Sequence, residues 1–175
     1  MKIVAFGASI SKKSINKTLA TYVANLVTDA EIDVVDLAEF ELPLFSVDTE
    51  EVIGQPQAAK DFLARIAAAD ALVISFAEHN ASYTAGYKNL FDWASRIDLK
   101  VFQGKPAIYL SASPGKGGAA NVLAAAKGSA AYFGADLKAS VSIPSFHDVF
   151  DFETNRITDP KIQHSLEDAA GALTA

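Results

Sequence analysis

Three polar stretches of this chain each follow a short apolar run, and the first has residue types suited to binding a phosphate group. It runs from Gly7 to Asn16 and contains the hydroxyls of Ser9, Ser11 and Ser14 as well as the Asn16 amide. Donors beside a helix start bind anions well, because the first helical N–H groups have no partner within the helix. The same residues also suit a plain helix cap, since Ser and Asn favour that position. This stretch alone leaves both interpretations open.

The second and third stretches add a polar turn and a glycine-rich loop. The second, Ala77–Ser82, follows the apolar run Ala71–Phe76 and leads into a helical pattern. The third, Ser111–Gly118, contains glycines that allow a backbone to approach a flat ligand closely, although a plain strand-to-helix turn would also use them. The first stretch has neither the G-x-G-x-x-G dinucleotide pattern nor the P-loop pattern. A mononucleotide therefore suits these stretches better than a dinucleotide.

The elements that must position these stretches alternate along the chain. Strands are expected at 2–6, 32–37, 71–76, 107–111 and 137–143, and apolar stripes of helical period cover 15–26, 59–66, 87–97 and 122–133. A last helix is expected from Pro160, which suits a first helical turn, to about Ala172. This alternation predicts one α/β domain over residues 1–175, a three-layer α/β/α sandwich whose five-stranded parallel sheet has the order 2-1-3-4-5. Strands one, three and four are then neighbours, so the three polar stretches meet at one sheet edge. Long loops are expected at Glu39–Gln55 and Pro144–Thr158.

Composition excludes several classes of function. The chain has 175 residues, a net charge of -6 and no cysteine, so disulfides and thiolate metal sites are excluded and redox work would need a bound cofactor. No basic cluster exceeds Lys12–Lys13, which argues against nucleic-acid binding. The apolar runs are shorter than the ~20 residues that span a bilayer, and the first residues enter a strand directly. A cytoplasmic protein with no membrane segment and no signal peptide is expected.

Taken together, the three stretches resemble the signature loops of the NADPH-dependent FMN reductase family, within the flavodoxin-like superfamily. That family also includes soluble quinone, azo-dye and chromate reductases. The matching positions are Ser9, Ser14, Asn16, Glu78, Asn80, Ser82, Lys88, Asn89, Asp92, Trp93 and the run Ser113–Gly118. Ser11 stands where the family usually has Arg, and Ala77, His79 and Thr84 replace its Pro, Tyr and Pro. The resemblance covers most of the chain, and the second stretch carries its most specific motif.

The resemblance implies bound FMN, with NADPH or NADH as the co-substrate and a flavin, a quinone or a similar small molecule as the electron acceptor. The phosphate is expected at the first stretch, and the flavin ring along the second with the third at its other edge. The residues implied in FMN binding are Ser9, Ser11, Ser14, Ile15, Asn16, Ala77, Glu78, His79, Asn80, Ser82, Ser113 and Gly115. The cofactor carries the chemistry, and His79 could donate to the reduced flavin, although a surface histidine without a role in the reaction fits the sequence equally well. A homodimer or homotetramer is also implied.

Two other functions compete with this interpretation. A flavin-binding electron carrier or sensor would use the same fold without reductase turnover. A serine hydrolase with Ser9 as nucleophile and His147 or His164 as base is a remote alternative, because the Gly-x-Ser-x-Gly pattern is absent. The group His147, Asp148 and Asp151 matches no metal-ligand spacing and is interpreted as a solvated loop.

The helical pattern after the second stretch predicts three further contacts. Tyr87, Phe91 and Trp93 are expected to pack in the core or between subunits rather than contact the cofactor. Asp92 and Arg96, four residues apart, are expected to form a surface ion pair. Trp93 lies off the main apolar stripe, which favours a contact between subunits.

Overall fold

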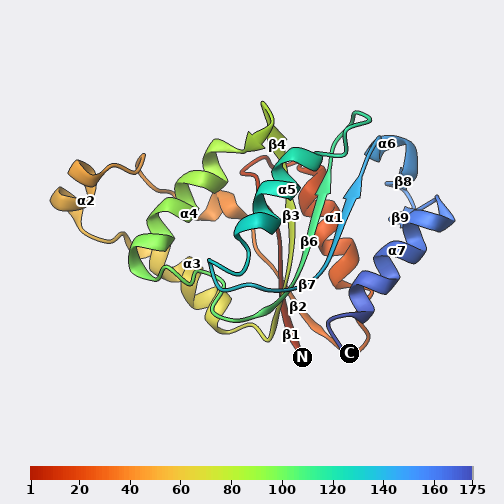
Figure 1. Cartoon of the computed structure of the whole chain (residues 1–175), viewed down its shortest axis with the longest axis horizontal. Coiled ribbons are helices and arrows are strands. Elements are labelled where there is room, and N and C mark those ends of the chain that lie inside the picture. Colours follow the sequence, from red (N-terminus) through yellow and green to blue (C-terminus); the bar gives the residue numbers. More distant parts are fainter. Residues whose placement is uncertain (175) are drawn as a thin grey trace.

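The computed structural model describes residues 1–174 of the chain and contains one five-stranded parallel sheet (Figure 1). Its strands, in the order β2-β1-β3-β6-β7, are β1 (Lys2–Gly7), β2 (Glu31–Val34), β3 (Ala71–Phe76), β6 (Pro106–Ala112) and β7 (Asp136–Ile143). Ile3 of β1 pairs with Ile32 on one side and Ala71 on the other, and Leu72 pairs with Ala107. The predicted strand order is confirmed.

Helices cover both faces of this sheet. The first layer is α1 (Ile15–Ala24) with α7 (Pro160–Gly171), and the second is α3 (Gln57–Ala67), α4 (Ala85–Ile97) and α5 (Ala120–Ser129) (Figure 1). Along β1, Ile3 and Ala5 pack toward the first layer, whereas Val4 and Phe6 pack toward the second. Because the central strands are buried on both faces, they are apolar throughout. The three-layer architecture is confirmed.

Both segments predicted as long loops contain short elements, so that part of the prediction is wrong. They include α2 (Val47–Ile53), α6 (Phe146–Val149) and the small hairpin of β8 (Phe150–Asp151) and β9 (Arg156–Ile157). The second strand also ends at Val34 instead of Leu37, where the 3₁₀ helix η1 (Leu37–Glu39) begins. No residue of α2 is buried, so it has no apolar stripe by which the sequence could reveal it. A further hairpin, β4 (Glu78–His79) with β5 (Ser82–Tyr83), follows β3.

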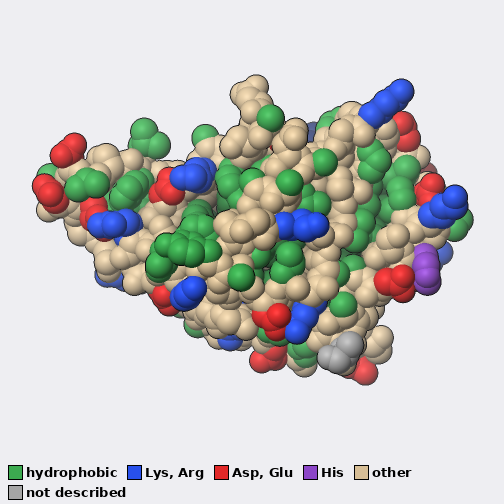
Figure 2. All heavy atoms as spheres, viewed as in Figure 1, with side chains coloured by type: hydrophobic (Ala, Val, Ile, Leu, Met, Phe, Trp, Pro, Cys, Tyr) green, Lys and Arg blue, Asp and Glu red, His purple; other side chains and the backbone are tan. Residues whose placement is uncertain are grey.

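The segment 41–56 around α2 projects from the body of the molecule, and we call it the α2 arm (Figure 1). The end of the arm carries acidic and hydrophobic side chains at the surface (Figure 2). Leu44 and Val52 are 82% and 83% exposed. The arm therefore presents apolar surface that the rest of the described chain does not cover.

The base of the arm packs on α4 and buries Trp93 completely. The Trp93 indole Nε1 donates to the Pro43 carbonyl at 2.8 Å, and its ring meets Phe45 edge to face at 5.0 Å between centroids. The prediction that Trp93 contacts a second subunit is therefore wrong. The physical reason is that a distant segment of the same chain covers the side of α4 that its helical period leaves bare.

The ion pairs of α4 also differ from the prediction. Asp92 pairs with Lys88, one turn earlier, with 2.7 Å between nitrogen and oxygen. Arg96 instead pairs with Glu50 of α2 at 2.9 Å. The expected pair between Asp92 and Arg96 is wrong because each side chain has another partner within reach. Tyr87 is buried in the core, as predicted.

Within residues 1–174, no helix combines the length and the apolar character needed to cross a membrane.

Candidate functional site

The loops after β1, β3 and β6 meet at the carboxyl edge of the sheet, where they enclose an open hollow of about 220 Å³. We call it the loop hollow. Nine predicted site residues line it: Ser9, Ser11, Ser14, Ile15, Asn16, Ala77, Glu78, His79 and Ser113. The other predicted residues, Asn80, Ser82 and Gly115, lie outside its lining, and Lys13, Ala112 and Pro114 complete it without having been predicted. Three segments, separated by 61 positions from Asn16 to Ala77 and by 33 from His79 to Ala112, thus line one hollow.

The first loop combines a helix cap with free hydrogen-bond donors. The Ser14 hydroxyl caps α1 by accepting from the Lys17 N–H at 3.3 Å, and the Ser9 hydroxyl accepts from the Ser11 N–H at 3.1 Å. Each hydroxyl acts there as an acceptor, so its hydrogen can still be donated. The Ile15 N–H is in the first turn of α1 and has no partner within the helix. Helix capping and anion binding, left open by the sequence, are therefore compatible.

The Asn16 side chain is buried and has a structural role. It is 3% exposed, and its amide Nδ2 donates to the Ala112 carbonyl at 3.1 Å. Its Oδ1 accepts from the Ser75 hydroxyl at 2.7 Å and from the Ala112 N–H at 2.9 Å. Asn16 thereby connects the start of α1 to the ends of β3 and β6. Ser75, a polar residue inside an apolar strand, is the sequence signal for this contact.

Gly7 allows α1 to begin this close to the sheet. A Cβ atom at Gly7 would lie 2.8 Å from the backbone carbon of Asn16, and no rotation of a side chain could relieve that overlap. The close approach brings the helix start directly over the end of β1.

The second loop is a tight hairpin. Asn80 and Ala81 form its two-residue turn with φ angles of 52° and 61°, the left-handed pair that a type I′ turn requires. The turn projects His79 to the surface, where its side chain is exposed. The Thr84 hydroxyl, buried at the end of the hairpin, donates to the Ala8 carbonyl at 2.8 Å and so fixes the second loop against the first.

Glu78 connects the second loop to α5. Its carboxylate accepts from the Val122 N–H at 2.8 Å and from the Asn121 amide at 3.4 Å, both in the first turn of that helix. Ala119, at the N-cap position of α5, has no polar side chain that could accept hydrogen bonds from this first turn. A carboxylate at a helix N-terminus also gains from the helix dipole. The Glu78 carboxylate is thus already occupied by the fold, although the residue lines the loop hollow.

The third loop is fixed through its glycines. The Gly118 carbonyl accepts from the hydroxyls of Ser111 at 2.6 Å and Ser142 at 2.8 Å. Gly118 has a φ of 59°, and a Cβ there would overlap the Ser142 hydroxyl. The Gly115 carbonyl accepts from the Ser113 hydroxyl at 2.9 Å, which orients that residue beside the loop hollow.

Two side chains of opposite formal charge line the hollow: Lys13 of the first loop and Glu78 of the second, whose carboxylate caps α5. Lys17 donates to Asp36 at 2.7 Å, and this hydrogen bond holds the pKa of the Asp36 carboxyl below its ordinary value. Lys17 does not line the hollow, whereas Lys13 does and has no ion-pair partner among residues 1–174.

The arrangement does not support hydrolase or metal chemistry. In the described chain no histidine hydrogen-bonds Ser9, and His164 lies 3.4 Å from Asp168 on α7. No cluster of three or more potential metal ligands occurs within residues 1–174, including the group at 147–151.

Comparisons with known proteins agree with this geometry. Residues 1–148 match the family described as NADPH-dependent FMN reductase. An NAD(P)H-dependent FMN reductase from Pseudomonas aeruginosa is 30% identical over 99% of this chain and 93% of its own length. A 2-hydroxy-1,4-benzoquinone reductase from a Burkholderia species is 37% identical over 75% of this chain and 71% of its own.

Solved structures show the same fold. FerB, a flavoenzyme NAD(P)H:(acceptor) oxidoreductase from Paracoccus denitrificans, aligns with a TM-score of 0.80 and 25% identity over 98% of this chain and 94% of its own. A flavodoxin from Pseudomonas aeruginosa aligns with a TM-score of 0.60 at 14% identity over the full length of both chains. With its sheet order, loop arrangement and sequence matches in agreement, the chain belongs to the NADPH-dependent FMN reductase family and has the flavodoxin-like fold.

Proposed function

We propose that this chain binds FMN across its three loops and uses NADPH or NADH to reduce a small acceptor, a flavin or a quinone. Family membership makes it an NAD(P)H-dependent reductase of the FMN and quinone type. The observation that carries the assignment of the site is the loop hollow, in which hydroxyl donors, a helix start and a glycine-rich loop face one another.

The donor set at the first loop fits a phosphate monoester. Ser9, Ser11 and Ser14 supply hydroxyls, and Ile15 supplies a helix N–H group. Lys13 also lines the hollow, and we assign to it the positive charge that the family's Arg, replaced here by Ser11, would otherwise supply. We assign the phosphate to these groups, whereas the Asn16 side chain contributes by fixing the start of α1.

The second and third loops are assigned to the flavin ring. We place the ring along Glu78–Asn80, with Ser113 and Gly115 at its other edge. FMN, when bound, supplies hydride and electron transfer through its ring, and the protein supplies position and electrostatics. Since the Glu78 carboxylate caps α5, the exposed His79 is the side chain we propose to donate toward the ring.

Titration of the purified chain with FMN, followed by flavin fluorescence, tests the proposal. The wild type should quench FMN saturably and should bind riboflavin, which lacks the phosphate, more weakly. The double variant Ser9→Ala, Ser14→Ala should lose FMN affinity while its riboflavin affinity stays the same. Loss of the Ser14 cap costs about 1 kcal/mol of stability, so circular dichroism must confirm that the variant is folded. Unchanged FMN fluorescence with the wild type would refute the proposal.

Steady-state kinetics separate a reductase from an electron carrier. With NADPH or NADH as donor and a quinone or free flavin as acceptor, we expect ping-pong kinetics with parallel double-reciprocal lines. The reason is that donor and acceptor would bind alternately at the same face of the flavin. FMN binding without turnover in the presence of either nucleotide would favour the carrier.

We also propose a homodimer or homotetramer in the cytoplasm. Because Trp93 is covered within the chain, the exposed Leu44 and Val52 of the α2 arm are the better candidates for a subunit contact. Light scattering should give a mass of two or four chains, and a lower one for Leu44→Ser with Val52→Ser.

A further inference from the structure

One buried hydrogen bond joins the first loop to the end of the second, and these are the loops assigned to the phosphate and the ring of FMN. The Thr84 hydroxyl, directly after the hairpin of β4 and β5, donates to the Ala8 carbonyl at 2.8 Å. Thr84 is 3% exposed and Ala8 is 1% exposed. Neither residue lines the loop hollow, so the contact lies behind the site rather than facing a ligand.

Ala8 is the residue at which the first loop leaves the sheet. Its N–H donates to the Ser75 carbonyl of β3 at 2.8 Å, and its own carbonyl accepts from Thr84. The next residue, Ser9, supplies the first of the hydroxyls assigned to the phosphate. A shift of the Ala8 carbonyl would therefore move the Ser9 hydroxyl relative to the second loop.

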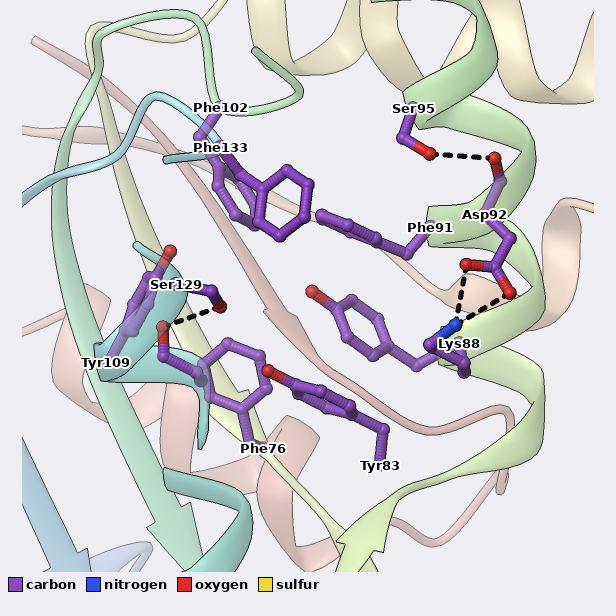
Figure 3. Close-up of a pocket in the computed structure, with 12 residues that line it drawn as sticks. Phe76, Tyr83, Lys88, Phe91, Asp92, Ser95, Phe102, Tyr109, Ser129 and Phe133 are labelled. Atoms are coloured by element: carbon purple, nitrogen blue, oxygen red, sulfur yellow. Dashed lines mark hydrogen bonds and ion pairs between the residues drawn. The ribbon is translucent and has the colours of Figure 1, made fainter. Parts of the chain in front are cut away.

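Thr84 is itself held in place by the residues on either side of it. The Tyr83 ring before it lies against the Phe76 ring of β3, with 6.0 Å between the centroids (Figure 3). After it, α4 begins, and the Thr84 hydroxyl accepts from the Tyr87 N–H at 3.4 Å as the N-cap of that helix. One side chain thus caps α4 and holds the first loop.

A second contact joins the first loop to the start of α4. A Cβ atom at Gly86, in the first turn of α4, would lie 2.7 Å from the Ile10 Cγ2, so the Ile10 side chain packs directly on the helix backbone. Ile10 is 53% exposed and does not line the loop hollow. The first loop is therefore held against α4 at Ala8 and again two residues later.

The hydroxyl contact belongs to this chain rather than to the family pattern. Thr84 stands where the resemblance places a Pro, and its φ of -65° is the angle at which a proline ring fixes the backbone. Either residue thus supports the same backbone at the start of α4, but only Thr has a hydroxyl to donate to Ala8.

We propose that Thr84 is a positioning residue that sets the distance between the phosphate-binding loop and the ring-binding loop. The inference rests on the proposed FMN site, because it assigns the two loops to two parts of one ligand. Two linked groups gain the full advantage of their linkage only when their sites are already held at the matching distance. Loss of the Thr84 hydroxyl should therefore weaken binding of the phosphate part and leave binding of the ring part unchanged.

Fluorescence titrations with FMN and with riboflavin, which lacks the phosphate, measure the two parts. Thr84→Val, which replaces the hydroxyl by a methyl group, should weaken FMN binding about three- to tenfold, as expected for one lost hydrogen bond, at unchanged riboflavin affinity. Thr84→Ser keeps the hydroxyl and should restore most of the FMN affinity. Ile66→Val, at a fully buried position of α3 outside the loop hollow, controls for lost stability and should leave both affinities unchanged.

Amide hydrogen exchange reports on the first loop without any flavin. The N–H groups of Ser11 and Ser14 donate to the Ser9 hydroxyl and to the Ser11 carbonyl, and both should exchange several-fold faster in Thr84→Val than in the wild type. Should Thr84→Val fail to fold, Ile10→Ala decides instead, because Ile10 is half-exposed and its loss spares the core. That variant should weaken FMN, and not riboflavin, by a smaller factor.

Four results would overturn the inference. They are unchanged FMN affinity in a folded Thr84→Val variant, or in Ile10→Ala where it takes that place; equal weakening of FMN and riboflavin; no recovery in Thr84→Ser; and unchanged exchange of the Ser11 and Ser14 N–H groups. A wild type that binds no FMN would refute the proposed function, and this inference with it. A wild type that binds FMN while Thr84→Val binds it equally well would refute this inference alone.

Discussion

The Asn16 side chain connects α1 to two strands, so its removal should destabilise the whole fold. In Asn16→Ala, three buried groups lose their partner: the Ser75 hydroxyl, the Ala112 N–H and the Ala112 carbonyl. Each unsatisfied buried group costs roughly 1–3 kcal/mol, and water entering the vacated space offsets part of it, so we expect a total of about 3 kcal/mol. For a chain of this size that loss lowers the melting temperature by roughly 6–12 °C.

Urea unfolding followed by circular dichroism measures this cost. Ser75→Ala is the matched control, because it removes one of the three hydrogen bonds and leaves the two to Ala112 intact. A double-mutant cycle between the two positions should show coupling, since their side chains are in contact. FMN affinity of Asn16→Ala, measured at a temperature where the variant is folded, should change less than that of the Ser9, Ser14 double variant.

If Asn16→Ala lowers the free energy of unfolding by less than 1 kcal/mol, with an unchanged slope of that free energy against urea concentration, this reasoning is refuted. A large loss of FMN affinity at unchanged stability would also refute it, because Asn16 would then contact the ligand directly, as the sequence suggested.

Three further predictions concern local structure. Asp36→Asn should lower the free energy of unfolding by up to about 1 kcal/mol above pH 5, because the Lys17 hydrogen bond stabilises the charged carboxylate. This difference from the wild type should vanish as the pH falls below 3.8, the ordinary pKa of the carboxyl. Gly118→Ala should cost about 1–3 kcal/mol through its positive φ and the overlap with the Ser142 hydroxyl. Ala81→Gly should stabilise the protein by about 0.5–1 kcal/mol, because glycine adopts the left-handed turn conformation without strain.

Urea midpoints check all three. For Asp36, a difference from wild type that persists at pH 2 would contradict the charge-based explanation. Gly117→Ala, where a Cβ meets nothing within 4 Å, is the control for Gly118→Ala and should change stability by less than about 0.5 kcal/mol. Equal costs at Gly117 and Gly118 would contradict the conformational argument, as would any loss of stability in Ala81→Gly.

The sequence alone determined the sheet and the edge at which its three polar loops meet. Strands such as Ala71–Phe76 are apolar throughout because both faces of a parallel sheet are covered, and this local signal specified the alternation of elements. The strand order was then expected from the order common to doubly wound folds with five strands, and the structure has that order. The order brings the loops after β1, β3 and β6 together, so most predicted site residues line one hollow.

Only the tertiary structure decided what several of those residues do. Asn16 and Ala112 are 96 positions apart in the sequence, and Glu78 is 44 positions from Val122, so no local pattern could show that these groups satisfy each other. The period of its own helix places Trp93 off the apolar stripe and therefore predicted a contact with another subunit, but the α2 arm of the same chain covers this residue. The same holds for Tyr109, because the lack of a hydrogen-bond partner for its buried hydroxyl among the described residues is a property of the packing around it. Periodicity reports which face of an element is buried, whereas the partner on that face depends on how the whole chain packs.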